Sequence, residues 1–247
     1  MKGVFGKYLY VDLSTGSLSD YKIPESWYKL HVGGRGIAAR IMLKELEPGV
    51  DPLGEKNIII FATGPLQGTG IPGSGRNLVM AKSPRTNAVS DSFVGGFFGH
   101  ELGRSGYDGI IIRGKAPRPQ YLTIIDGHAE LYDANELWGK TTAETEEELK
   151  KKHKGVRVAC IGPGGEKLVA FACVINDRNR AAGRPGFGAV MGSKQLKAIA
   201  VKGSVEKQLH DKAKLNELRA EFVKYLVEVK AELGKYCLLY TSPSPRD

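Results

Sequence analysis

An internal duplication restricts the fold of this chain more than any other feature of its sequence. The pattern FG, then G, then IIIRG in residues 98–114 recurs 89 positions later as FG, G and IAVKG in residues 187–203. Two further pairs keep the same order, IFATGP at 60–65 with VACIGP at 158–163, and YLYVD at 8–12 with YLTII at 121–125. Two repeats in one order predict two similar sheets related by a pseudo-two-fold axis. A ligand site is expected at their junction, where equivalent Gly-rich loops meet.

Short apolar runs bounded by Gly, Pro and Asp predict a domain dominated by β-sheet. The predicted strands are Tyr8–Leu13, Asn57–Ala62, Asn77–Ala81, Gly109–Arg113, Tyr121–Ile125, Val156–Ile161, Leu168–Ile175 and Ala198–Lys202. We therefore expect an α+β fold made of two similar, mainly antiparallel β-sheets related by internal duplication, with flanking helices.

Residue spacing predicts three helices. One has an apolar face formed by Ile37, Ala38, Ile41 and Met42, with Arg40 and Lys44 turned outward. A second, near Thr141–Lys152, carries three glutamates at 146–148, each four residues before a lysine at 150–152. This order suits side-chain pairing and the helix dipole, so we interpret the block as a solvated helix. A third helix, Asp211–Leu233, has an apolar stripe expected to pack on a further domain.

Residues 176–194, NDRNRAAGRPGFGAVMGSK, place three arginines among glycines and alanines. The guanidinium groups of Arg178, Arg180 and Arg184 are suited to bidentate bonding of phosphate oxygens. The glycines at 183, 186, 188 and 192 have no Cβ, so the backbone can take positive φ and approach a bulky ligand. These residues predict a phosphorylated cofactor lying against main chain. A Gly-rich turn with a solvated basic face is the alternative that they leave open.

Composition indicates a globular protein. The 247 residues, 41% of them hydrophobic, suffice for one large domain or two small ones with a real core. No apolar run approaches the ~20 residues that a membrane span needs, and no signal segment is visible, so we expect a cytoplasmic protein with no membrane partner. The net charge of +9 fits phosphate ligands or an acidic partner, although scattered lysines are also typical of a solvated surface. We expect no nucleic-acid partner.

Several common sites are excluded by spacing. Cys160, Cys173 and Cys237 are isolated, without the Cys-x-x-Cys spacing that usually holds iron–sulfur clusters, and we expect the first two to be buried apolar residues. No P-loop pattern occurs, and the glycines at 33–36 lack the spacing of a dinucleotide fingerprint. The five histidines show no metal-ligand spacing.

Seven longer segments follow one another along the chain: KYLYVDLSTGSLSDYKI, VGGRGIAARIMLKEL, FATGPLQGTGIPGSGRNLVMAKSP, GGFFGHELGRSGYDGIIIRGKA, DANELWGKT, CIGPGGEKLVAFACVIND and RAAGRPGFGAVMGSKQLKAIAV. Together, from Gly3 to Gly203, they resemble the N-terminal domain of the tungsten-containing aldehyde:ferredoxin oxidoreductases. The resemblance implies a pterin-binding domain in residues 1–205 and the start of a truncated helical second domain in residues 206–236. The tail 237–247, CLLYTSPSPRD, reads as a sequencing-adapter artefact.

The resemblance implies a site for a tungsten bis-molybdopterin cofactor. By position, Arg76 in GSGRNLV and Arg180 in NRAAGR match the family's arginines that contact the pterin phosphates. Further cofactor-binding positions are expected at Gly95, Gly96, Ala181, Gly183 and Arg184.

A magnesium ion bridging the two pterin phosphates is implied at the main-chain oxygens of Phe93 and Ala181. The family often has Asn at the position of Phe93, but the ligand is a carbonyl group, so the departure weakens the match without removing it.

The implied parent enzyme oxidises an aldehyde to a carboxylate at tungsten or molybdenum and passes electrons through a [4Fe-4S] cluster to ferredoxin. Its catalytic residues and cluster ligands are expected downstream of this chain, so no catalytic residue is named and the chain alone is expected to be inactive. A homodimer is compatible with the family. One alternative is a tungsten subunit of the benzoyl-coenzyme A reductase type, which tends to vary the arginine loop. The other is a non-catalytic anion-binding scaffold.

Overall fold

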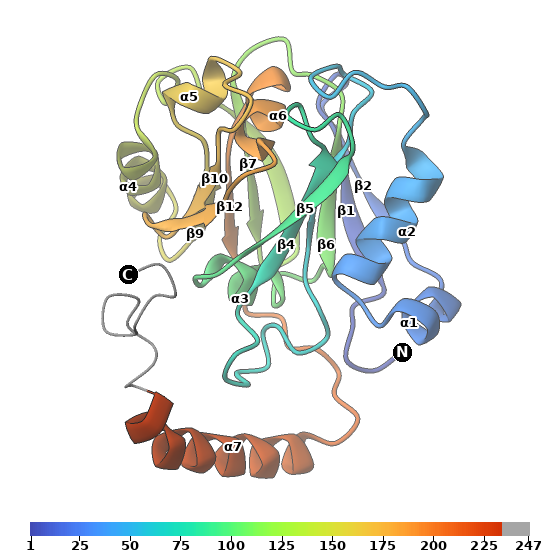
Figure 1. Ribbon diagram of the computed structural model, residues 1–247, viewed down its shortest axis with the longest axis vertical. Helices are drawn as coiled ribbons and strands as arrows, with labels where there is room; N and C mark the ends of the chain where they lie inside the picture. Colours follow the sequence, from blue (N-terminus) through green and yellow to red (C-terminus); the bar gives the residue numbers. More distant parts are fainter. Residues whose placement is uncertain (234–247) are drawn as a thin grey trace, which may run out of the picture.

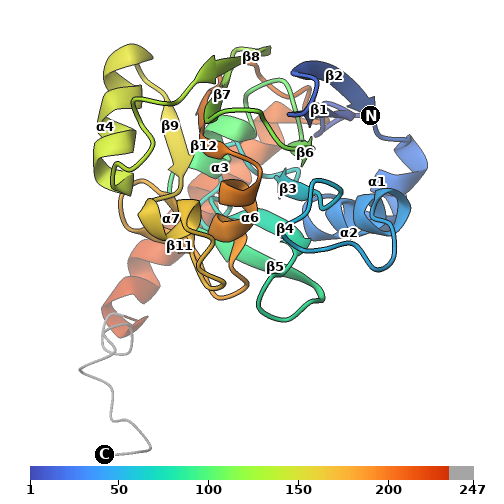
Figure 2. The same cartoon turned by 90° about the horizontal axis from the view of Figure 1, so that it is seen from above.

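A computed structural model gives the positions of residues 1–233, with side chains described as far as Val229, in two six-stranded sheets and seven helices (Figures 1 and 2). It confirms the predicted α+β class. The predicted adapter-derived tail at 237–247 and the end of the predicted second-domain segment, 234–236, lie outside the described residues.

Each repeat forms one sheet. The first sheet has the order β2-β1-β6-β3-β4-β5, with β1 (Lys7–Asp12), β2 (Ser17–Lys22), β3 (Ile59–Ala62), β4 (Asn77–Lys82), β5 (Val89–Val94) and β6 (Gly109–Arg113). The second has the order β11-β10-β9-β12-β7-β8, with β7 (Gln120–Ile125), β8 (His128–Asp133), β9 (Arg157–Cys160), β10 (Val174–Asn176), β11 (Arg180–Ala182) and β12 (Leu196–Lys202).

The two sheets have the same topology, which confirms the duplication seen in the sequence. Read from β8, the second sheet repeats the first strand for strand: each begins with a hairpin, β1–β2 or β7–β8. In each, the first hairpin strand pairs in parallel with the last strand of the repeat, β6 or β12, and the other pairs are antiparallel. The sheets are therefore mainly antiparallel, as predicted.

The strand predictions failed at sheet edges and in one loop. The four strands absent from the prediction, β2, β5, β8 and β11, are the edge strands, whose side chains are largely exposed and polar. The predicted strand Leu168–Ile175 is wrong except for its last two residues, because the chain turns back at Leu168, which has φ 60°, and the amide of Val169 donates to the carbonyl of Gly164.

Three apolar clusters define the layers. The largest lies between the sheets and includes α3 (Phe98–Leu102) and α6 (Phe187–Ser193). A second joins the outer face of the first sheet to α1 (Glu25–His31) and α2 (Arg35–Glu45), and a third joins the second sheet to α4 (Thr142–Lys152) (Figure 1). The predicted apolar and exposed faces of α2 are confirmed.

The duplicated Phe-Gly pairs are explained by packing at the start of α3 and α6. Phe98 and Phe187 are both fully buried in the core between the sheets. A Cβ on Gly99 would lie 3.0 Å from the carbonyl oxygen of Gly75, and one on Gly188 would lie 2.5 Å from that of Cys173. These glycines let a helix approach backbone, so for Gly188 the expected role in approaching a ligand is wrong. Gly192 likewise packs against the backbone of Gly165, in α5 (Pro163–Glu166).

The glutamate block of α4 is not simply a solvated face, which corrects the prediction. Of the three expected i,i+4 pairs, only Glu146 with Lys150 forms. Glu146 is nearly fully buried and accepts a hydrogen bond from the amide of Arg178 at 2.8 Å, while Glu147 pairs with the guanidinium of Arg178 at 2.5 Å. The helix thus holds the arginine loop in place.

The two cysteines in the described residues differ in environment. Cys160 is buried, and burial raises the pKa of its thiol to about 12. Cys173 is only partly buried, because its loop does not continue the predicted strand. The expectation of a buried apolar role is therefore confirmed for Cys160 and wrong for Cys173.

Helix α7 (Lys212–Leu233) lies apart from both sheets, below them in Figure 1. It confirms the predicted third helix, and its exposed apolar side chains are Leu218, Phe222, Val223, Tyr225 and Val227. None of the helices in residues 1–233 combines the length and apolar composition required to cross a lipid bilayer.

Lys194 connects the two repeats through a buried ammonium group. Its side chain is fully buried, and Nζ donates hydrogen bonds to the carbonyl oxygens of Glu55 (3.3 Å) and Gly114 (3.1 Å) in the first repeat. Burial, assisted by the charge of Arg113, lowers the pKa of Lys194 from 10.5 to about 7. Above that pH the neutral amine retains hydrogen-bonding capacity without the cost of a buried charge.

Replacing Lys194 with Met should remove a pH-dependent part of the folding free energy. Between the folded pKa of about 7 and the unfolded value of 10.5, the unfolded chain binds a proton that the folded chain does not. This group should therefore raise the free energy of unfolding by about 1.4 kcal/mol per pH unit in that window. In urea unfolding from pH 7.5 to 9.5, the free energy of unfolding of wild type should increase relative to that of Lys194→Met as the pH rises.

The exposed neighbour Lys115 supplies the control. The stability difference between wild type and Lys115→Met should stay constant over the same pH range. A constant difference for Lys194→Met as well would contradict the proposed loss of its proton on folding.

Candidate functional site

The two repeats meet where the edge strands β5 and β11 run side by side, and Asp177 joins them. Its Oδ2 accepts the amide hydrogen of Phe97 in the first repeat at 2.5 Å, and its Oδ1 pairs with Arg157 at 3.4 Å. Phe97 is the N-cap of α3 and has no side-chain cap of its own, so Asp177 takes that role from the other repeat.

Glycines at this junction allow the loops to approach closely. Gly96 has φ 96°, and a Cβ there would collide with Oδ2 of Asp177 and lie 3.4 Å from Cγ of Arg180. A Cβ on Gly75 would lie 3.4 Å from the carbonyl oxygen of Gly96, and one on Gly95 would lie 4.0 Å from Cδ of Arg180. The structure therefore brings the predicted residues Gly95, Gly96 and Arg180 together, next to the residue that precedes Arg76.

Arg76 lies on the wall of an open cavity of about 530 Å³. Val32, Pro65, Leu66 and Phe93 also line it, so most of the wall is apolar. Gln67 fixes this wall, because its Nε2 donates to the carbonyl oxygen of Arg76 at 2.6 Å and its Oε1 accepts the amide hydrogen of Gly64. The cavity is large enough for a small organic ligand.

Phe93 is exposed at the rim of the same cavity. The guanidinium of Arg35 lies 4.8 Å from the centre of its ring, and Arg35 is in turn paired with Asp91 at 2.6 Å. The side chain of Phe93 therefore forms a cation–π contact with Arg35. Because Phe has no side-chain oxygen, its main-chain carbonyl is the group that could bind a metal.

The arginines near the junction divide into two groups. Arg157 and Arg178 are bound to carboxylates, those of Asp177 and Glu147. Arg76, Arg180 and Arg184 are exposed, and their guanidinium groups form no ion pair among residues 1–229. Of the arginine loop, then, Arg180 and Arg184 can bind an anion without first breaking an ion pair, whereas Arg178 cannot.

The arginine loop has an unusual backbone. Asp177, Arg178 and Arg184 all take the left-handed conformation, with φ 44°, 64° and 52°. Such conformations cost on the order of 1 kcal/mol or more for a residue with a Cβ and persist where surrounding contacts impose them. Here the buried Glu146 accepts the amide hydrogen of Arg178, which supplies one such contact.

The remaining predicted residues lie along β11 and beyond it. Ala181 is exposed on β11, and a Cβ on Gly183 would lie 3.6 Å from Sγ of Cys173. The carbonyl of Pro185, next to Arg184, accepts a hydrogen bond from Ser83 at 2.7 Å. Ser83 follows β4 whereas Arg76 precedes it, and a six-residue strand is about 20 Å long. The structure therefore places Arg184 toward the opposite end of β4 from Arg76.

Two buried amides at the junction keep unused hydrogen-bonding groups. Asn77 and Asn176 are fully buried and face each other, with Nδ2 of Asn176 donating to Oδ1 of Asn77 at 3.4 Å. Nδ2 of Asn77 and Oδ1 of Asn176 have no partner within the described residues. Because both side chains are fully buried, an ordered internal water would satisfy these groups.

Sequence reasoning missed three contributors to the site. Asp177 was part of the quoted arginine loop but was not predicted as a contact, and Gln67 was not singled out at all. The segment Gly33–Gly36 was excluded as a dinucleotide fingerprint, yet Gly33 and Gly34 line a cavity of about 240 Å³ together with Arg76. The glycine pair at 33 and 34 indicates that another group approaches the backbone closely there, but the sequence does not identify that group.

Residues 8–203 match the family model described as aldehyde ferredoxin oxidoreductase, N-terminal domain. The chain is 48% identical over 216 residues to the tungsten-containing aldehyde ferredoxin oxidoreductase of Pyrococcus furiosus, covering 87% of this chain and 36% of that protein. It is 46% identical over 228 residues to the protein of the same name from Pyrococcus abyssi, covering 92% and 38%. The chain thus spans little more than a third of these relatives.

A solved structure has the same fold. It is described as the active site complex BamBC of benzoyl coenzyme A reductase in complex with 1,5 dienoyl-CoA, and it superposes with a TM-score of 0.90 at 37% sequence identity. The match covers 93% of this chain and 35% of that chain.

Removing the Asp177 carboxylate should weaken the junction between the repeats. Asp177→Ala leaves the amide of Phe97 and the guanidinium of Arg157 without their acceptor, which should cost about 1–3 kcal/mol of unfolding free energy. Asp177→Asn keeps an acceptor oxygen and should lose less. Urea unfolding measures both, with the exposed ion-pair residue Asp20 as control, where Asp20→Ala should cost less than about 1 kcal/mol. Equal costs for Asp177→Ala and Asp20→Ala would contradict this role.

Proposed function

The chain belongs to the family of aldehyde ferredoxin oxidoreductase N-terminal domains, and on that premise we propose that residues 1–205 form one wall of a tungsten bis-molybdopterin site. The observation that carries the proposal is that Gly96 of the first repeat lies beside both Gly75, which precedes Arg76, and the side chain of Arg180 from the second repeat. Arg76 and Arg180 are both exposed, on either side of this glycine loop. A ligand with two phosphate groups fits such a pair, because each arginine can form a bidentate bond.

Main chain supports the same ligand. Phe93 and Ala181 lie on the neighbouring edge strands β5 and β11, and edge strands retain carbonyl groups that no further strand pairs. We propose that these two carbonyl oxygens hold the magnesium ion between the phosphates. Gly95, Gly96 and Gly183 would let the cofactor lie against backbone, and Arg184 would extend the positive charge along β11.

The activity proposed for the whole protein is oxidation of an aldehyde to a carboxylate, with electron transfer through a [4Fe-4S] cluster to ferredoxin in the cytoplasm. When bound, the tungsten centre supplies the redox chemistry. The residues of this chain would bind and orient its phosphates, beside the mostly apolar wall around Arg76. Because the chain covers little more than a third of its relatives, we assign catalytic and cluster-binding residues to the rest of such an enzyme, which residues 206–236 would begin.

A second candidate is a subunit of the benzoyl-coenzyme A reductase type, favoured by the TM-score of 0.90 with a complex of that name. The intact RAAGR loop and the higher identity to the aldehyde enzymes, 48% against 37%, support the first candidate. Assay of the complete gene product with an aldehyde and a viologen dye, and separately with an aromatic thioester, would distinguish them.

Loss of Arg76 or Arg180 should reduce cofactor retention. A charge-assisted bond to phosphate contributes roughly 1.5–3 kcal/mol, so Arg76→Gln or Arg180→Gln should weaken retention by about tenfold to a hundredfold, and both together should nearly abolish it. The complete gene product should be purified from tungsten-supplied cells and its tungsten per polypeptide measured by elemental mass spectrometry.

Arg178 provides a matched control in the same loop, because its guanidinium is already bound to Glu147. Arg178→Gln should keep close to wild-type tungsten content. A double variant of Arg76 and Arg180 that folds normally by circular dichroism and retains wild-type tungsten would show that the assignment is wrong.

A further inference from the structure

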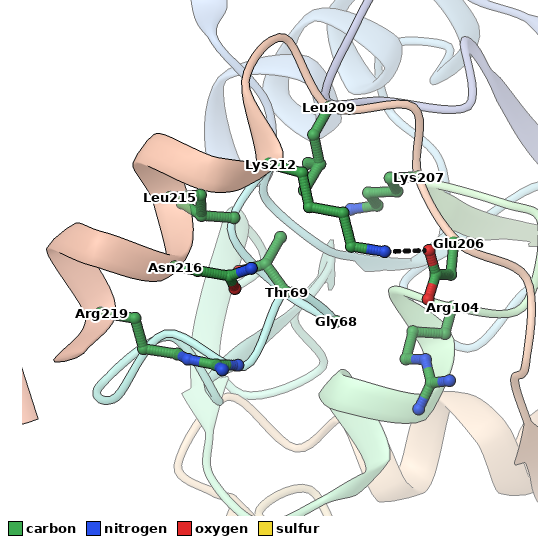
Figure 3. Close-up of a pocket in the computed structure, with 10 residues that line it drawn as sticks. All are labelled: Gly68, Thr69, Arg104, Glu206, Lys207, Leu209, Lys212, Leu215, Asn216 and Arg219. Carbon is green, nitrogen blue, oxygen red and sulfur yellow. Dashed lines mark hydrogen bonds and ion pairs between the residues drawn. The ribbon is translucent and has the colours of Figure 1, made fainter.

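A second positively charged cavity lies between α7 and the rest of the molecule (Figure 3). Its volume is about 180 Å³, and Arg104, Lys207, Lys212 and Arg219 line it together with the single carboxylate of Glu206. At roughly 30 Å³ per water molecule, this space holds about six waters, which suits one small ion and excludes a dinucleotide.

Lys207 is the buried member of this group. Its side chain is only 9% exposed, and Nζ donates to the carbonyl oxygens of Gly64 (3.2 Å) and Gln67 (3.1 Å). An ammonium group has three donors, so one is not used by these carbonyl groups. Nζ also lies 5.7 Å from the centre of the Phe5 ring, and no carboxylate pairs with it among residues 1–229. Burial lowers the pKa of Lys207, opposed by the charge of Asp108. A bound anion would stabilise this buried charge.

The two arginines add charge that is also unpaired. Lys212 and Glu206 form an exposed ion pair at 2.9 Å, which neutralises the rim. Arg104 and Arg219 form no ion pair within the described residues, and Nη1 of Arg219 lies 3.1 Å from the Cβ position of Gly70. Figure 3 shows Arg219 and Arg104 on opposite sides of the segment that carries Gly68 and Thr69. Because Glu206 cancels the charge of Lys212, the positive charges of Lys207, Arg104 and Arg219 remain unbalanced in the cavity.

Helix α7 has little else to hold it at this position. Among residues 1–229, hydrogen bonds that involve a side chain join it only to itself and to Glu206 and Asp211, in the connection that precedes it. An anion in the cavity would bridge Arg219 on α7, Lys207 on the connection and Arg104 at the end of α3.

We propose that this cavity binds a phosphate-sized oxyanion through Lys207, Arg104 and Arg219, and that the anion fixes α7 against the loops of the first repeat that carry Gly68 and Arg104. The ligand is either free phosphate or the phosphoryl end of a small phosphomonoester. The site is separate from the Arg76 cavity and does not depend on the cofactor, although both share one turn: Lys207 binds the carbonyl of Gln67, whose side chain holds the carbonyl of Arg76.

Titration calorimetry on the whole chain tests this proposal. The chain should carry Arg76→Gln and Arg180→Gln, so that phosphate cannot bind at those arginines. Inorganic phosphate at low ionic strength should then bind saturably with one site per chain. A parallel titration with glycerol 3-phosphate distinguishes free phosphate from a phosphomonoester as the ligand. If glycerol 3-phosphate binds more tightly than inorganic phosphate, the ligand is a phosphomonoester.

In that background, Arg104→Gln and Arg219→Gln should each weaken phosphate binding by about tenfold or more, since each removes a charge-assisted donor. Lys207→Met should abolish binding, and the two arginine variants carry the test if this buried change prevents folding. Arg118→Gln, at an exposed arginine paired with Asp133, is the matched control and should change the affinity less than twofold. Absence of saturable binding, or binding unaffected by both arginine variants, would overturn the proposal.

Discussion

The hydrogen bond from the amide of Phe97 to the carboxylate of Asp177 is the contact on which the candidate site depends. It caps α3 of the first repeat with a side chain of the second, and Arg157 balances the charge of that side chain. The carboxylate occupies the space that a Cβ on Gly96 would need, so the glycine is required by the junction itself. This contact holds the loop that leads to Arg180 against Gly96, which in turn contacts the residue before Arg76.

Duplication explains why such a site is available. Each repeat builds the same sheet and ends it with an exposed edge strand, β5 or β11, and the two edges meet at the junction. The carboxylates near that junction bind Arg157 and Arg178, which leaves Arg76, Arg180 and Arg184 without ion-pair partners in the described residues. A loop that pairs some of its arginines and leaves others unpaired retains positive charge that an anionic ligand can use.

The sequence predicted the interior of the fold better than its boundaries. Central strands such as β3 and β6 are buried and mostly apolar and were predicted, whereas edge strands such as β2 and β8 carry polar side chains like those of turns. The resemblance predicts Arg76, Gly96 and Arg180 as site residues, and the contact of Gly96 with Arg180 follows from the junction of the two repeats. The buried Glu146 and the left-handed Asp177 could not be predicted, because their partners are distant in sequence and no local spacing indicates them.

The central claim is that the two repeats hold the phosphates of one cofactor together. A crystal structure of the complete gene product with its cofactor bound tests this claim most directly, through the distances from the phosphate oxygens to the two guanidinium groups. The account predicts phosphate oxygens within about 3 Å of both Arg76 and Arg180, with neither arginine paired to a carboxylate. Phosphates bound by residues of one repeat alone, with the other arginine in solvent, would contradict it.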